Sequence, residues 1–229
     1  MEQLPTKRTP GDVAHDVARG LISAIPAAGG PLQVLFETVF SAPLEKRKEK
    51  WMQELALALI ELQQTVNDFT PEKLAENEAF ITMAIRASNI AIRSHQQIKL
   101  DALRNAIVNS ARSSSIDEDE QMAFIHLIDQ FTPSHLRLLG LLHDPQQWIT
   151  INGCPESSDR FKSVWSLIAL CMPDLIVRED TVNNLVRDLQ SSGIVEQMLS
   201  VGAVIEGSGA LEPRTTAYGR RFVYFISVS

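Results

Sequence analysis

The chain has 229 residues, of which 45% are hydrophobic and 21% charged, and its formal net charge is -7. This composition is ordinary for a globular protein and excludes collagen-like, low-complexity and largely disordered classes. The length allows one large domain or two small ones, each able to bury a core. No segment is strongly basic: residues 134–229, for example, carry 8 basic and 10 acidic side chains. Proteins held to DNA through phosphate contacts generally have a basic face, so the charge disfavours nucleic acid as a partner.

The cysteines and the N-terminal residues bear on the cellular compartment. Cys154 and Cys171 are the only two cysteines, too few for the disulfide framework of a small secreted protein. The N-terminal residues MEQLPTKRTPGD contain no apolar stretch directly after their basic side chains, so we expect no signal peptide. The prediction is a cytoplasmic protein.

An apolar helical hairpin is predicted over residues 13–42. Apolar side chains recur every four residues over 13–25, a spacing typical of an amphipathic helix. The residues PAAGGP at 26–31 interrupt it, and a second short helix follows at about 32–41. Because a membrane-spanning helix needs about 20 uninterrupted apolar residues, we expect this hairpin to pack on the protein or a partner, with no stable transmembrane insertion. Its candidate interaction residues are Leu32, Leu35, Phe36 and Phe40; a membrane-perturbing effector using segment 17–42 is an alternative.

Two long helices are predicted next, over 44–67 and 71–112. In the first, apolar side chains from Trp51 to Phe69 recur at spacings of three and four, which indicates packing in a helical bundle, with a coiled-coil seam as the alternative. Thr70 and Pro71 suit the start of the second. Since no glycine or proline lies between Glu72 and Arg112, 71–112 is expected to form one long helix or two nearly collinear ones.

A stripe of basic and polar side chains follows from that second helix. At 100° per residue, four side chains fall within about 20° of one line along a continuous helix. The stripe either solvates the outer face of the bundle or grips an anion, such as an acidic partner helix or a nucleic-acid phosphate, for which the planar fork of arginine is well suited. Its members are Arg86, Arg93, Gln97 and Arg104.

The C-terminal third contains short helices and an expected hairpin. The acidic run 117–120 suits the start of a helix over 117–131. Helices are then predicted over 134–143, 158–171 and 181–191, followed by two apolar stretches separated by a turn at 207–209, and by a terminal helix after Thr215.

Two short motifs stand out in residues 132–229: Gly193-Ile194-Val195 directly after a predicted helix, and Thr216, Gly219 and Phe222 at the start of the terminal one. They resemble the winged-helix family, in which the first motif ends the third helix and starts the wing, and the second opens the closing helix. The resemblance implies a winged-helix-like module with a small β-hairpin at 132–229. With the helices predicted before it, the expected fold is mainly α, an N-terminal helical region at 1–131 followed by this module. The resemblance also implies a contact face on the third helix, formed by Asn183, Asn184, Arg187 and Gln190.

Protein contact is favoured over DNA contact for this face. Asparagine, glutamine and arginine can read base edges, but acidic Glu206 and Glu212 flank the expected turn and no basic residue lies in it. Winged helices also serve as protein-binding and dimerisation modules.

No catalytic or metal site is predicted from the residues. His126, His135 and His143 lack the spacing of metal ligands, and the two cysteines are 17 residues apart with no CxxC. Neither a nucleophile elbow nor a phosphate-binding loop is present. We therefore expect no cofactor and no enzyme, but a non-catalytic interaction or regulatory protein whose partner is another protein or a second copy. A DNA-binding winged-helix regulator is the alternative.

Overall fold

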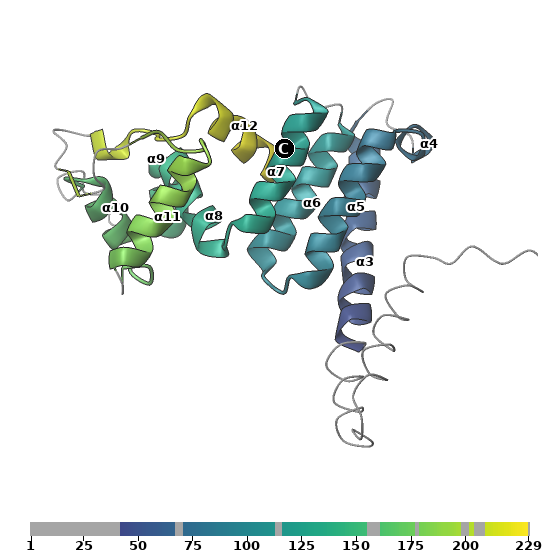
Figure 1. Cartoon of the computed structure of the whole chain (residues 1–229), viewed down its shortest axis with the longest axis horizontal. Helices are drawn as coiled ribbons and strands as arrows, with labels where there is room; N and C mark the ends of the chain where they lie inside the picture. The colour runs from purple at the N-terminus through teal and green to yellow at the C-terminus, as the bar shows by residue number, and fades with distance from the viewer. Residues whose placement is uncertain are drawn as a thin grey trace, which may run out of the picture. The chain divides into compact units, whose positions relative to one another are not determined.

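The computed structural model describes residues 42–66, 71–112, 116–154, 161–176, 179–197, 202–203 and 209–228. The chain divides into two compact units, Met1–Lys50 and Trp51–Ser229. The described helices (Figure 1) are α3 (Ala42–Thr65), α4 (Pro71–Ala75), α5 (Glu78–Arg93), α6 (Gln97–Ala111), α7 (Glu118–Gln130), α8 (Pro133–His143), α9 (Pro145–Asn152), α10 (Val164–Cys171), α11 (Glu179–Ser191) and α12 (Ala217–Ile226), with a 3-10 turn, η3, at Gly209–Leu211.

The expected mainly helical fold is confirmed, but the expected β-hairpin is wrong. Across the described ranges there is no strand, and Val195 and Thr215 form an isolated antiparallel bridge. The pairing cannot lengthen because Pro213 has no N–H and the Arg214 N–H donates instead to the Leu142 carbonyl at 2.7 Å. On the other side, Thr216 already caps α12. Residues 204–208, with most of the expected turn, lie outside the described residues.

Three helices occupy the region where one long helix, or two collinear ones, was expected. Asn77 caps α5, its side chain accepting from the Phe80 N–H at 3.0 Å. Ser94 ends α5 and accepts from the Gln96 N–H at 3.3 Å. Short polar side chains of this kind compete with the helix for backbone hydrogen bonds. The chain therefore turns over three residues, and α5 and α6 pack side by side (Figure 1).

The aromatic core joins α7 to the C-terminal helix α12. The Phe124 ring is fully buried and lies 5.0 Å from Tyr218, 5.2 Å from Phe222 and 5.6 Å from Phe225, measured between ring centroids. Helix α12 also contacts α6 and α8. The core is therefore continuous across residue 131, where the boundary between a helical region and a C-terminal module was expected; that boundary stays a prediction.

The glycines that suggested a winged helix bring α12 close to the end of α11. Gly193 adopts a left-handed φ of 73°, a conformation that suits glycine. Thr216 Oγ1 accepts from the Gly219 N–H at 2.9 Å and donates to the Gly193 carbonyl at 2.6 Å. A Cβ on Gly219 would clash with the Ile194 carbonyl oxygen. The residues that gave the resemblance, from Gly193 to Gly219, therefore allow the start of α12 to lie close to the backbone that follows α11.

Replacing Gly219 with alanine is expected to lower the free energy of unfolding by about 3 kcal/mol, because backbone must move to admit the methyl group. The matched control is Gly153→Ala at the end of α9, where φ is 66° but a Cβ meets nothing within 4 Å. That variant should cost about 1 kcal/mol through backbone strain alone. Urea unfolding measures both; equal losses would contradict the close approach of α12.

Candidate interaction surface

Helix α3 is apolar on two sides, of which one is buried. Trp51, Leu55 and Leu62 face the core of the second unit. On another side, Met52 and Ile60 are 51% and 52% exposed. From Trp51 to Val66 the charged side chains are Glu54 and Glu61 alone, and both line a groove toward α6. Depletion of charge together with exposed apolar area is typical of the centre of protein interfaces.

Helix α5 continues this apolar surface. The Trp51 Nε1–H donates to Ser88 Oγ at 2.9 Å, and Ile81 shares a hollow with Ile60, so α3 and α5 run antiparallel beside each other. Ile85, one turn after Ile81, is 57% exposed. We call Met52, Ile60, Ile81 and Ile85 the apolar face.

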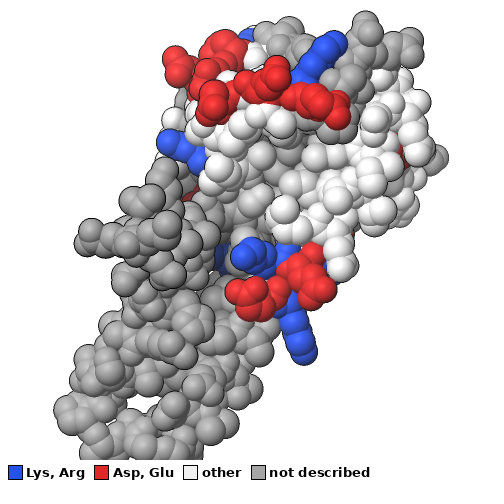
Figure 2. Space-filling view, turned by 90° about the vertical axis from the view of Figure 1, so that its right-hand side faces the viewer, with Lys and Arg blue, Asp and Glu red and all other residues white. Residues whose placement is uncertain are grey.

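The hollow in the apolar face lies between α3, α4 and α5 and has a volume of about 290 Å³. In Figure 2 an uncharged surface is seen with acidic side chains gathered along its upper edge. The residues that line the hollow are Leu59, Ile60, Gln63, Leu74, Ala75, Phe80 and Ile81. It is therefore almost wholly apolar within and open at the surface.

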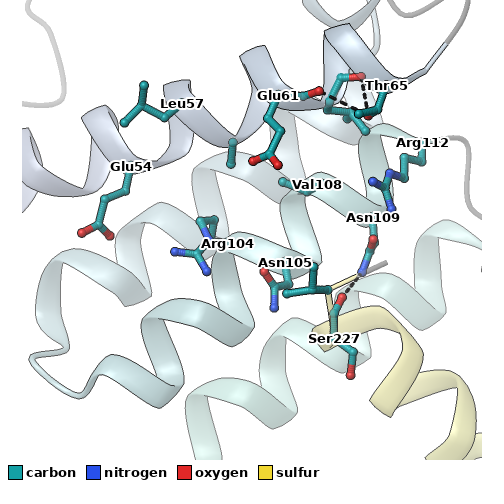
Figure 3. Close-up of a pocket in the computed structure, with 13 residues that line it drawn as sticks. Glu54, Leu57, Glu61, Thr65, Arg104, Asn105, Val108, Asn109, Arg112 and Ser227 are labelled. Carbon is teal, nitrogen blue, oxygen red and sulfur yellow. Dashed lines mark hydrogen bonds between the residues drawn. The ribbon is translucent and has the colours of Figure 1, made fainter.

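A second groove, of about 540 Å³, lies between α3 and α6 (Figure 3). Its polar side chains on α6 fasten the end of α12. The Nδ2 of Asn109, a buried residue, lies 3.1, 2.9 and 2.9 Å from the carbonyl oxygens of Tyr224, Phe225 and Ser227. One turn earlier, Asn105 Nδ2 donates to the Ile226 carbonyl at 2.9 Å. These carbonyls lie at the end of α12, where backbone acceptors lack the partner that a further helical turn would supply; the Tyr224 carbonyl also accepts from the Ser227 N–H at 3.4 Å. This part of the groove is therefore structural.

The predicted basic stripe comes from two helices, because the chain turns at 94–96. Arg86 and Arg93 belong to α5, and Gln97 and Arg104 to α6. Arg86 is exposed. Arg93 Nη2 lies 3.8 Å from a carboxylate oxygen of Asp129. Asp101 accepts from Gln97 at 3.1 Å and pairs with Arg104 at 3.0 Å. Three of the four side chains thus engage carboxylates of this chain, and an anion-binding role stays a prediction.

The predicted contact face of α11 also makes internal contacts. Asn184 and Arg187 are exposed, and Asn183 and Gln190 are half-buried. The Arg187 guanidinium donates to Asn184 Oδ1 at 3.0 Å, and the Gln190 side chain donates to the Glu196 carbonyl at 3.0 Å. The role of this face stays a prediction.

One arrangement has the outline of a nucleophile, base and acid. His135 Nδ1 lies 2.9 Å from Thr132 Oγ1, and its Nε2 lies 3.2 Å from an Asp188 carboxylate oxygen. However, Nδ1 also accepts from the Thr132 backbone N–H at 3.1 Å, as in a capping box at the start of a helix. His135 is buried and its ring stacks on Phe131. This geometry starts α8 and does not present a base to a substrate.

The two cysteines meet in space. A side-chain hydrogen bond joins the Cys154 and Cys171 thiols. Burial, with a further contribution from Cys154, raises the pKa of Cys171 to about 12. The Cys171 thiol therefore stays protonated at neutral pH and is a poor nucleophile. In the part of the chain that the structure describes, no group of three or more His, Cys, Asp or Glu side chains could hold a metal ion.

The predicted apolar segment lies outside the described residues, which begin at residue 42; this applies to Leu32, Leu35, Phe36 and Phe40. Among the helices that the structure describes, none is long and apolar enough to cross a membrane.

The apolar face was not among the predicted surfaces, although the sequence contains a signal for it. The residues LALALIEL at 55–62 are apolar around most of the helix, which indicates more than one covered side. Spacings of three and four residues identify one side of a helix. They therefore predict the buried stripe of this helix but not its second apolar side.

Comparison with protein-family models, curated proteins and solved structures found no significant match to this chain.

Replacing Asn109 with alanine is expected to lower the free energy of unfolding by about 3 kcal/mol, since it leaves the carbonyl of buried Phe225 without its side-chain donor and removes the contacts with the Tyr224 and Ser227 carbonyls. Asn105→Ala is the control: it removes one half-buried bond and should cost about 1 kcal/mol. Both changes are measured by urea unfolding. If the two variants lost the same stability, Asn109 would not be the main fastening of α12.

Proposed function

We propose that this chain is a non-catalytic interaction module whose apolar face binds another protein. The observation that carries the proposal is the exposure of Met52, Ile60 and Ile85 on α3 and α5, together with the apolar hollow that Ile60 lines. These side chains stand on α3 and α5, which the hydrogen bond between Trp51 and Ser88 joins. A surface on joined helices loses less conformational entropy on binding than an unfolded segment does.

The distribution of polar groups supports protein binding over the alternatives. Asn105 and Asn109 fasten α12, and His135 starts α8. Arginine side chains that would be needed for phosphate contacts, such as Arg93 and Arg104, already face carboxylates of this chain. DNA binding is therefore the less favoured function. The small number of cysteines supports a cytoplasmic location for the activity.

The test compares the full chain with Ile60→Asp in affinity purification followed by mass spectrometry and in thermal unfolding. We expect the variant to lose the proteins retained by the wild type, because a carboxylate in an apolar interface costs binding energy. Its melting temperature should hardly change, because substitutions of exposed side chains usually alter stability by less than about 0.5 kcal/mol.

Ile151→Asp is the matched control, since Ile151 is 72% exposed on α9, which lies outside the apolar face. It should retain the same proteins as the wild type. Equal loss in both variants, or no loss in either, would refute the proposal. A large fall in melting temperature for Ile60→Asp would show that the chain itself covers this face.

A further inference from the structure

The shape and the charge of the apolar face together specify a class of partner, and this inference rests on the proposed function. We infer that the apolar face binds a basic amphipathic helix, whose apolar side chains enter the hollow between α3, α4 and α5 and whose lysine or arginine side chains meet the acidic side chains around it.

The shape favours a helix as the bound element. Two antiparallel helices, α3 and α5, form the two walls of the hollow, and α4 closes one end. Along α3, Met52, Ala56, Leu59 and Gln63 are separated by four, three and four residues, the spacing by which one helix packs against another. Helices that bind in such grooves insert apolar anchors at the same spacing. The hollow of about 290 Å³ offers room for a large apolar side chain.

The charge favours a basic partner. Residues 71–81, which comprise α4 and the start of α5, include three acidic side chains and one basic side chain, Lys73, and exposed Arg86 follows Ile85. Glu72, Glu76 and Glu78 are exposed and lie within a few residues of Leu74, Ala75 and Phe80, which line the hollow. Figure 2 shows acidic side chains along the upper edge of the uncharged surface, with Lys or Arg side chains beside them. Complementary charge raises the association rate and selects among partners.

The same charge disfavours a second copy of this chain. Two copies joined with their acidic edges facing would bring like charges together, and such juxtaposition is costly at an interface. A basic helix would offset these charges.

The experiment uses the full chain and two labelled 14-residue peptides in fluorescence anisotropy at about 0.15 M salt, where charges separated by more than about 8 Å are screened. One peptide has leucine at helical spacing and lysine elsewhere; in the other, glutamate replaces every lysine. We expect the Leu/Lys peptide to bind and the Leu/Glu peptide not to bind. Ile60→Asp and Ile85→Asp should each abolish binding of the Leu/Lys peptide.

The acidic edge is tested by Glu72→Gln with Glu76→Gln. This double variant should weaken Leu/Lys binding about fivefold, as expected for two exposed ion pairs. The matched control is Glu118→Gln with Asp119→Asn at the start of α7, where both side chains are exposed; it removes the same charge and should leave binding unchanged. Circular dichroism verifies that each variant is folded, and Ile85→Asp replaces Ile60→Asp if the latter is not.

Four results would overturn the inference. Equal weakening by both double variants would show that the net charge of the protein attracts the peptide. Binding of the Leu/Glu peptide that Ile60→Asp abolishes would leave the proposed function standing and refute the basic partner. Concentration-dependent dimers in sedimentation velocity, lost in Ile60→Asp, would assign the face to a second copy. If Ile60→Asp changed neither peptide binding nor protein capture, the proposed function would fail as well.

Discussion

The packing of α12 against Phe124 is the interaction on which the rest of the second unit depends. Three aromatic rings of α12 surround Phe124 within 5.6 Å. Burying each phenylalanine contributes about 1.5–3 kcal/mol, and a favourable aromatic pair adds about 0.5–1.5 kcal/mol. Since α12 touches α6, α7 and α8, these rings hold together helices that lie far apart along the chain. The Asn109 amide adds direction, because it fixes where α12 ends.

The polar and apolar parts of the described surface differ in their contacts. Several charged side chains pair with each other: Arg137 pairs with Asp174 at 2.6 Å, and the Arg221 guanidinium donates to the Glu120 carboxylate of α7. The apolar side of α3 and α5, in contrast, has exposed isoleucine and methionine side chains and no charge of its own. This contrast between the two kinds of surface is the basis of the proposed interaction function.

The comparison between the predicted wing and the observed fold shows how a correct local pattern can lead to a wrong element. Gly193, Thr216 and Gly219 do what the resemblance required locally: a helix ends, a cap forms and two segments approach closely. Yet the same contacts end the pairing after one bridge, because Thr216 starts a helix and Arg214 donates to α8. In this chain the sequence pattern predicts correctly where helices end and begin, but not the structure of the segment that connects them.

The sequence by itself determined the helical class, the buried stripe of α3 and the capping at Asp117, Thr132 and Thr216, because helical periodicity and cap chemistry depend on residues a few positions apart. The division of residues 71–112 into three helices also depends on local residues, Asn77 and Ser94, although no proline or glycine marks these positions in the sequence. Only the tertiary structure decided which side of α3 stays exposed, that Asn109 serves α12, and that Cys154 meets Cys171. Each of these depends on which distant segments become neighbours, and the packing of the Phe124 cluster sets that, since its rings come from residues about 100 positions apart in the chain.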